Sequence, residues 1–211
     1  MGPTGAGKST VINLISRFYN LNEGEITIDG INIADVTLKS LRNKMGIMLQ
    51  DSFLFTGTIM DNIRYSKLDA TDEEVIEAAK AVCAHKFISE LPEGYSTQIR
   101  EGGSGLSAGQ KQLIAFARTL LCDPRILILD EATSSIDTET EIDLQKGLES
   151  LLKGRTSFVI AHRLSTIKNS SRIMYVANKT IEESGTHEEL LEKKGKYYNL
   201  YMAQYKFLEQ L

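Results

Sequence analysis

The chain has 211 residues and a formal net charge of −4, so its length suits one domain, or one domain with a helical appendage. The acidic balance argues against nucleic acid as the main partner, because phosphate backbones are bound through clustered Lys and Arg. No apolar run approaches the roughly 18 residues that a membrane-spanning helix needs, and the start does not resemble a secretory signal. Two isolated cysteines, Cys83 and Cys122, indicate neither a disulfide framework nor a metal cluster.

Helix-like and strand-like segments alternate along the chain, which predicts an α/β fold with a largely parallel sheet. The glycine-rich residues 1–10 lead into a predicted helix that reaches about residue 18. The predicted strands cover residues 25–29, 45–49, 126–129 and 156–161, and residues 172–176 and 180–183 form a predicted hairpin. Further helices are predicted over residues 72–91, from Ser107 to Asp123-Pro124, and over residues 187–211.

The glycine-rich segment fits the full pattern Gly-x-x-x-x-Gly-Lys-Ser of a phosphate-binding P-loop. Glycines let the backbone wrap closely around a phosphate chain, so that successive N–H groups point inward, and the following helix adds its positive end. Lys8 is expected to reach the β- and γ-phosphates of ATP, and the Ser9 hydroxyl to ligate Mg²⁺. A glycine-rich turn that binds no ligand is the alternative. It is disfavoured because every residue of the P-loop pattern is present at the required position. The predicted nucleotide-binding residues here are Gly2, Pro3, Thr4, Gly5, Ala6, Gly7, Lys8, Ser9 and Thr10.

Two acidic residues follow the apolar strand at residues 126–129, namely Asp130 and Glu131. Ligands bind at the carboxyl ends of parallel strands. Asp130 is expected to hold Mg²⁺, through water because this ion keeps several waters, and Glu131 is then free to polarise an attacking water. An acidic turn in solvent is the alternative for this pair alone, and the P-loop in the same chain disfavours it.

The segment Leu-Ser-Ala-Gly-Gln at residues 106–110 narrows the class of ATPase. It resembles the signature motif of ABC transporters, commonly Leu-Ser-Gly-Gly-Gln, with Ala108 in place of a glycine. The resemblance implies that Ser107, Gly109 and Gln110 contact ATP held by a second domain of the same kind, so that two nucleotides lie between two domains. Ser107 can also simply cap the helix that follows it.

Other landmarks of the resembled family occur in order along the chain. Gln50 resembles the glutamine that reaches Mg²⁺ and the attacking water and links to the membrane domains. Residues 134–137 resemble the loop that crosses the dimer interface. His162 resembles the histidine that contacts the γ-phosphate, although a lone histidine at a strand end is usually structural. The resemblance therefore implies catalytic roles for Glu131, His162, Lys8 and Gln50, and a Mg²⁺ site at Ser9, Gln50 and Asp130.

Residues 51–63 and 97–103 resemble ABC exporters in particular, with Arg100 where glycine is common. The resemblance implies a P-loop ATPase core at residues 1–50 and 111–211, and a helical subdomain at about residues 51–110. It also implies partnership with transmembrane domains at the cytoplasmic face of a membrane. An importer ATPase remains an alternative. A DNA-repair ATPase would carry a long coiled-coil insertion, and a non-catalytic module would lack Glu131 or His162.

The first residues raise a question of completeness, because a P-loop is built as strand, loop and helix. The loop starts at Gly2, which leaves no room for the strand, and the small β-subdomain and adenine-stacking aromatic residue of the resembled family have no counterpart. We therefore expect an N-terminally truncated domain. As an inactive fragment, it would fold poorly and hydrolyse little ATP compared with an N-terminally extended version.

Overall fold

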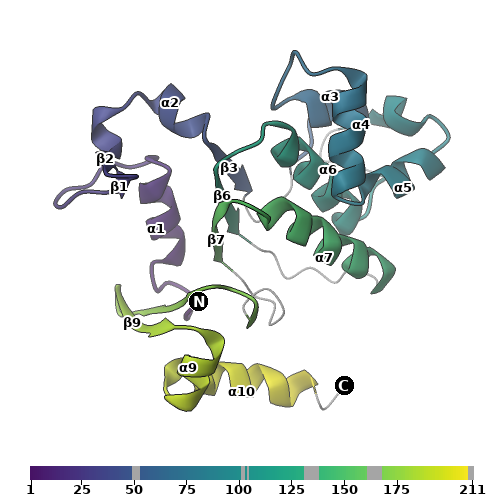
Figure 1. The fold of residues 1–211 in the computed structure, drawn as a ribbon. Coiled ribbons are helices and arrows are strands. Elements are labelled where there is room, and N and C mark those ends of the chain that lie inside the picture. The colour runs from purple at the N-terminus through teal and green to yellow at the C-terminus, as the bar shows by residue number, and fades with distance from the viewer. Residues whose placement is uncertain (49–52, 101–102, 104, 131–137, 161–167, 209–211) are drawn as a thin grey trace. The chain divides into compact units, whose positions relative to one another are not determined.

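The structure is a computed structural model that describes residues 1–48, 53–100, 103, 105–130, 138–160 and 168–208 (Figure 1). It divides into two compact units, one of Met1–Asp35 with Val159–Leu211 and one of Val36–Phe158. Within the described ranges, every helix is too short or too polar to cross a membrane.

The first unit contains short helices and two antiparallel hairpins. Its elements are α1 (Lys8–Ile15), β1 (Thr27–Ile28), β2 (Ile31–Asn32), a 3-10 turn (Ile33–Asp35), β8 (Ile173–Ala177), β9 (Thr180–Gly185), α9 (His187–Glu192) and α10 (Lys196–Leu208).

The second unit contains most of the helices and a parallel strand pair. Its elements are α2 (Leu38–Arg42), β3 (Met45–Met48), β4 (Gly57–Thr58), α3 (Ile59–Arg64), α4 (Asp72–Ala81), α5 (Ala84–Glu90), a 3-10 turn (Gly94–Ser96), β5 (Gln98–Ile99), α6 (Ala108–Leu121), β6 (Ile126–Asp130) and α7 (Thr138–Leu152). Strand β7 (Thr156–Ile160) runs across the boundary between the units.

A three-stranded sheet has the order β3-β6-β7. Strands β3 and β6 are parallel, with Met45 opposite Ile126 and Met48 opposite Leu129. The first four residues of β6 are buried, which confirms the buried parallel strand that the apolar run predicts. Gly46 allows close packing beside this strand, because a Cβ there would lie 2.7 Å from the methyl group of Thr119 on α6. The mixed α/β class with a parallel sheet is therefore confirmed.

Helix α6 lies among α3, α4, α5 and α7 (Figure 1). The apolar side chains of these helices form the core of the second unit; the fully buried ones include Ile59, Ile63, Val75, Ala79, Ile88, Ile114 and Ala117.

One predicted helix is wrong in its continuity. Residues 72–91 form two helices, α4 and α5, because Cys83 between them adopts a left-handed conformation with φ 64°. A Cβ at Gly147 of α7 would lie 2.6 Å from the carbonyl oxygen of Val82. The break between α4 and α5 thus coincides with a close approach of α7. The periodicity of residues 72–91 could not predict this break, because α7 is distant in the sequence.

The two hairpins of the first unit have two-residue turns with positive φ at both positions. The turn residues are Asp29 and Gly30 between β1 and β2, and Asn178 and Lys179 between β8 and β9. Such turns match the twist of the strands they join. The predicted 172–183 hairpin is confirmed, whereas the strand predicted over residues 25–29 is reduced to two residues.

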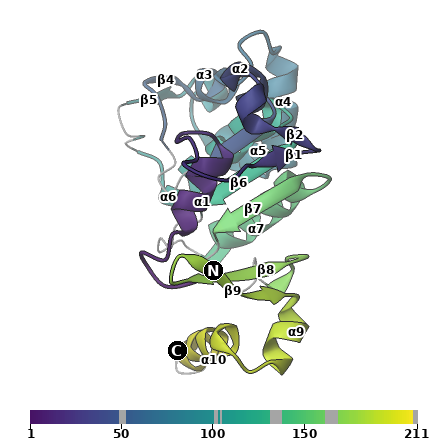
Figure 2. The same cartoon turned by 90° about the vertical axis from the view of Figure 1, so that its left-hand side faces the viewer.

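The predicted helical tail consists of two helices, α9 and α10, beside the β8–β9 hairpin (Figure 2). The carboxylate of Glu183 accepts hydrogen bonds from the backbone N–H groups of Lys196 and Tyr197, at 2.6 and 3.0 Å, and so caps α10. The buried His187 ring pairs through Nδ1 with the Tyr197 hydroxyl at 2.7 Å. These contacts hold the tail against the hairpin.

Candidate functional site

The glycines of the loop at residues 2–7 serve two different backbone needs. Gly2, Gly5 and Gly7 have φ values of 137°, 77° and 99°, which side-chain-bearing residues rarely adopt. At Gly2 space is restricted as well, because a Cβ would lie 1.9 Å from the carbonyl oxygen of Val176, whereas no atom lies within 4 Å of one at Gly5 or Gly7. Gly2 is therefore needed for a close backbone approach, and Gly5 and Gly7 for the curvature of the loop.

The residue before the loop is held beside strand β8. The Met1 amino group donates to the carbonyl of Met174, and the Val176 N–H donates to the carbonyl of Met1, both at 2.8 Å. Met1 thus bonds to the two residues that flank Tyr175, which is the hydrogen-bond pattern of parallel neighbouring strands. The loop thus leaves the sheet position next to β8 before it turns into α1 (Figure 2).

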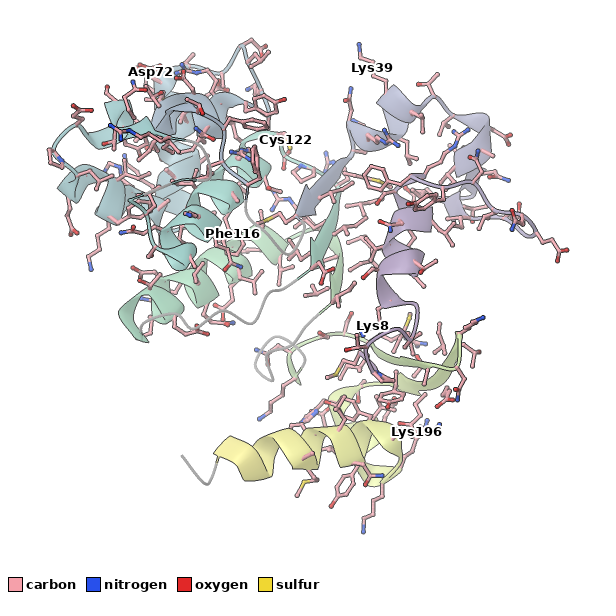
Figure 3. All side chains as sticks on the ribbon, turned by 180° about the vertical axis from the view of Figure 1, so that it is seen from behind. Lys8, Lys39, Asp72, Phe116, Cys122 and Lys196 are labelled. Carbon is pink, nitrogen blue, oxygen red and sulfur yellow. The ribbon has the colours of Figure 1, made fainter. Side chains whose placement is uncertain are left out.

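The ammonium group of Lys8 is held by the loop itself (Figure 3). It donates to the carbonyl oxygens of Gly2 and Pro3, each at 2.8 Å. An ammonium group has three N–H donors, so these two bonds fix its position and leave a donor that can face an anion.

The amino-terminal end of α1 carries no side-chain cap. Its N-cap residue, Gly7, is left-handed and makes no capping hydrogen bond through a side chain. Five other described helices have a hydroxyl cap, supplied by Thr37, Thr58, Thr71, Ser107 and Thr186. The first N–H groups of α1 therefore remain available to an anion, which the helix dipole also favours. Together with the placed ammonium, this donor set fits a phosphate chain.

The carboxyl end of β6 carries the partly buried Asp130. Because Met48 at the end of β3 pairs with Leu129, the carboxyl ends of both parallel strands lie at one edge of the sheet. Four predicted site features, namely Gln50, Glu131, residues 134–137 and His162, lie outside the described residues. Of the predicted metal and water site, the described residues therefore include only Ser9, in the first turn of α1, and Asp130, at the end of β6.

Ser107 and Gln110 form a reciprocal cap at the start of α6. The Ser107 hydroxyl accepts from the Gln110 N–H at 3.2 Å, and the Gln110 side-chain oxygen accepts from the Ser107 N–H at 3.0 Å. The predicted capping role of Ser107 is confirmed. Its hydroxyl is exposed and accepts in this cap, so its proton remains available for donation. Gly109 is buried within the first turn.

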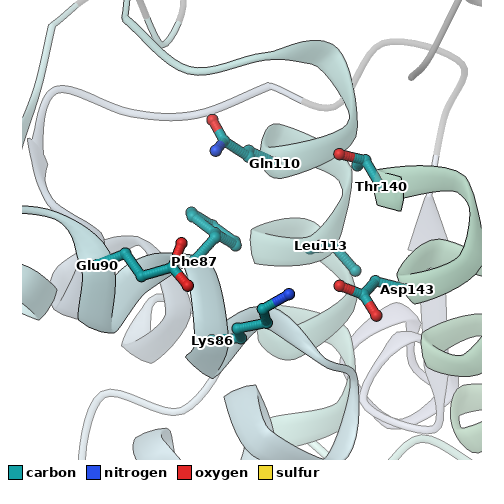
Figure 4. Close-up of a pocket in the computed structure, with 7 residues that line it drawn as sticks. All are labelled: Lys86, Phe87, Glu90, Gln110, Leu113, Thr140 and Asp143. Carbon is teal, nitrogen blue, oxygen red and sulfur yellow. The ribbon is translucent and has the colours of Figure 1, made fainter. Parts of the chain in front are cut away.

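A cavity of about 150 Å³ opens between α5, α6 and α7 (Figure 4). Gln110 lines it together with charged side chains that include Lys86 and Asp143. Sequence patterns do not predict this cavity, since its walls come from three helices that are separate in the chain.

A family model described as "ABC transporter" matches residues 1–134. The chain is 56% identical over 205 residues to the uncharacterized ABC transporter ATP-binding protein YfiC of Bacillus subtilis, covering 97% of this chain and 34% of that protein. It is also 56% identical to an ATP-dependent lipid A-core flippase of Desulfotalea psychrophila, over 97% of this chain and 36% of the flippase.

The fold is similar to the structure of a bacterial Atm1-family ABC exporter with ATP bound. The TM-score is 0.89 at 46% sequence identity, over 96% of this chain and 36% of the exporter chain. The chain spans about a third of the length of the curated relatives it matches. On the family match and these identities, the chain belongs to the ABC transporter family.

Proposed function

We propose that this chain binds and hydrolyses ATP as the nucleotide-binding domain of an ABC exporter. The observation that carries the proposal is the loop at residues 2–7, in which two carbonyls hold the Lys8 ammonium beside an uncapped helix end. The similarity to an Atm1-family ABC exporter supports export, and the relatives include lipid A-core flippases and a fatty acid ABC transporter ATP-binding/permease protein of Mycobacterium tuberculosis.

The proposed nucleotide site uses backbone amides of residues 2–10 for the phosphates and the Lys8 ammonium for the β- and γ-phosphates. Ser9, Gln50 and Asp130 are the proposed ligands of Mg²⁺, directly or through water. The ion, when bound, neutralises phosphate charge and helps to hold the phosphates in position. Hydroxyl, amide and carboxylate oxygens are ligands of the kind that Mg²⁺ prefers.

The proposed hydrolysis depends on Glu131, which orients and polarises the attacking water. Lys8 and His162 stabilise the negative charge that develops on the γ-phosphate, which is the main route of catalysis in phosphoryl transfer. Ser107, Gly109 and Gln110 would complete the site of a second domain of the same kind, because the exposed Ser107 hydroxyl keeps a proton that it can donate to phosphate.

The proposal includes the architecture in which such a domain works. Residues 1–50 and 111–211 form the ATPase core and residues 51–110 the helical subdomain. A transmembrane domain is the other partner, and the domain lies at the cytoplasmic face of the membrane. An importer ATPase is the second candidate, and the encoded sequence upstream of Met1 distinguishes the two, since membrane helices in the same reading frame favour the exporter.

The test is the substitution Glu131→Gln, with the exposed Glu23→Gln as the matched control. Removal of a general base typically lowers the rate by about 10²–10⁴-fold. In the N-terminally extended version of the chain, we expect Glu131→Gln to bind ATP as the unsubstituted version does, by calorimetry, while its rate of phosphate release falls by that factor. Hydrolysis at the unsubstituted rate would remove Glu131 from the mechanism, and a chain that binds no ATP at all would contradict the proposed function.

A further inference from the structure

Arg118 on α6 binds a segment that is distant in the sequence. Its Nε donates to the backbone carbonyl of Asn62 at 2.7 Å, its Nη1 to the backbone carbonyl of Phe53 at 2.9 Å, and its Nη2 to the side-chain oxygen of Asn62 at 2.9 Å. The guanidinium group is planar and presents its donors in a fixed fork. All three acceptors belong to residues 53–62, with Phe53 before α3 and Asn62 within it, so the fork fixes that segment against α6.

Asn62 extends the network into residues 53–58. This side chain is 2% exposed. Its amide nitrogen donates to the carbonyls of Phe55 and Thr58, at 2.9 and 3.0 Å, and its oxygen accepts from the Phe55 N–H at 2.8 Å. Arg118 thus holds a side chain that in turn holds the backbone of the segment.

Three aromatic side chains are positioned by this network, and we refer to Phe53, Phe55 and Tyr65 as the aromatic cluster. The Phe55 ring stacks on Tyr65 at 4.3 Å between centroids and meets the edge of Phe53 at 5.1 Å. The guanidinium carbon of Arg118 lies 5.3 Å from the Phe55 ring centre, within the range of a cation–π interaction. The cluster remains accessible, with exposed fractions of 58%, 37% and 56% in chain order.

The same helix carries Ser107 at its other end. Helix α6 is continuous from Ala108 to Leu121, so Arg118 lies about three turns from the capping box. The hydroxyl of Ser66 donates to the Arg118 carbonyl at 2.6 Å, which adds another tie between the helix and the segment after α3. The continuous helix and the fork therefore connect the start of α6 to the aromatic cluster.

We propose that Arg118 is a positioning residue that fixes residues 53–62 to α6, so that the aromatic cluster and the Ser107 end of the helix move as one body. The joint movement on ATP binding rests on the proposed function, whereas the attachment of residues 53–62 to α6 does not. Arg118 acts through the segment that it holds.

The alternative is a purely structural role in which Arg118 contributes packing and charge. Burial lowers the pKa of Arg118 from its ordinary value; the group nevertheless stays charged in proteins. A long stem and a charge are also supplied by lysine, but lysine lacks the planar fork that spans the Phe53 carbonyl and both Asn62 oxygens. Arg118→Lys therefore separates the two roles.

The first measurement is hydrogen–deuterium exchange of the nucleotide-free chain, read by mass spectrometry over peptides from residues 53–65. We expect Arg118→Lys and Arg118→Met both to speed exchange there by about tenfold, the effect of losing one or two hydrogen bonds. The matched control is Arg155→Lys, since Arg155 also binds backbone carbonyls, those of Pro124 and Leu151. The control is expected to leave residues 53–65 unchanged.

The second measurement adds Mg²⁺ and ATP to the chain in the Glu131→Gln background. Peptides covering residues 105–113 report engagement of the Ser107 end, and those covering 53–65 report the aromatic cluster. We expect both to slow together when Arg118 is present. With Arg118→Lys, only residues 105–113 are expected to respond.

The outcomes distinguish the two proposals. The positioning role is overturned if residues 53–65 exchange as slowly in Arg118→Lys as in the unsubstituted chain. It is also overturned if the Arg118 variants speed exchange uniformly over the whole chain. If ATP leaves the exchange of residues 105–113 unchanged both with Arg118 and with Arg118→Lys, the proposed ATP-driven dimerisation is wrong. The nucleotide-free measurement still decides the positioning role in that case. If both Arg118 variants fold poorly, Asn62→Leu serves instead, because it removes the side-chain acceptor of Arg118 together with the donors to Phe55 and Thr58. Unchanged exchange in that variant would also overturn the role.

Discussion

The amino-terminal ends of α1 and α6 are both proposed to face ATP phosphates, but they are built in opposite ways. At α1 the N-cap is a left-handed glycine without a capping side chain, and the nearby Lys8 ammonium is fixed by loop carbonyls. At α6 the Ser107 hydroxyl and the Gln110 side chain satisfy each other's backbone N–H groups. One end leaves its donors open, and the other closes them.

The difference indicates a division of labour between the two ends. An open helix end with a fixed cation can bind an anion with no help from another chain. A capped end already has acceptors for two of its N–H groups, so its contribution to phosphate comes from the remaining Ser107 O–H and from the other amides of the turn. We therefore expect α1 to set the affinity for ATP and α6 to act only when a second domain presents its nucleotide.

The largest effect on the open end is expected from Gly2→Ala. A Cβ there meets the Val176 carbonyl at 1.9 Å, and the φ of 137° adds strain; overpacking and backbone strain each cost about 1–3 kcal/mol. Gly5→Ala is the matched control, because its φ is 77° but no atom lies within 4 Å of the added Cβ. Urea unfolding should give the lower midpoint for Gly2→Ala. Equal midpoints would show that the contact with β8 is not tight in solution.

Lys8→Met is expected to have the next largest effect, on nucleotide binding. Hydrogen bonds to charged groups contribute about 1.5–3 kcal/mol each, so the dissociation constant for ATP should rise by about 10- to 100-fold. The control is Lys39→Met, an exposed lysine on α2 (Figure 3). Isothermal calorimetry measures both. An affinity for ATP that is unaffected by Lys8→Met would break the comparison, because the open end would then bind without its cation.

Local patterns predicted much of this fold and part of the site. The glycine positions of the P-loop, the Ser107 cap and the buried strand before Asp130 all depend on neighbours within a few residues, and the structure confirms them. The nucleotide-binding, metal-binding and catalytic roles of the site residues stay predictions, and Gln50, Glu131 and His162 lie outside the described part of the chain.

Features that depend on distant segments were not predicted. The helix break at Cys83 coincides with the approach of Gly147 to the Val82 carbonyl, and periodicity within residues 72–91 carries no sign of α7. The contact between Arg118 and Asn62 joins residues 56 positions apart. An arginine in an apolar helix face is the available signal, but it does not name the partner.

The closed end is expected to show a smaller effect, chiefly on stability. Ser107→Ala removes an N-cap, which costs about 1 kcal/mol. Thr71→Ala is the matched control, because Thr71 caps α4 in the same reciprocal way with Glu74. Both variants should lose similar free energy of unfolding by urea titration. Only Ser107→Ala should weaken ATP-dependent dimerisation in the Glu131→Gln background, and equal dimerisation in both variants would leave Ser107 as a cap alone.

The smallest expected effect concerns pH and separates the neutral cap of α6 from the charged cap of α3. At α3 the Thr58 hydroxyl and N–H both donate to the Asp61 carboxylate, and these hydrogen bonds hold the pKa of Asp61 below its ordinary value.

Because the folded-state pKa of Asp61 is lowered, its contribution to stability is present above the unfolded pKa of about 3.9 and is lost as pH falls through the lower folded value. At α6 the partner is Gln110, whose amide does not titrate. We therefore expect the amide resonance of Thr58 to shift only below that pH while the Ser107 amide stays constant, by NMR over the range in which the chain remains folded. Asp61→Asn should abolish the Thr58 shift. If the Ser107 amide resonance shifted over the same pH range, a carboxylate and not Gln110 alone would cap the start of α6.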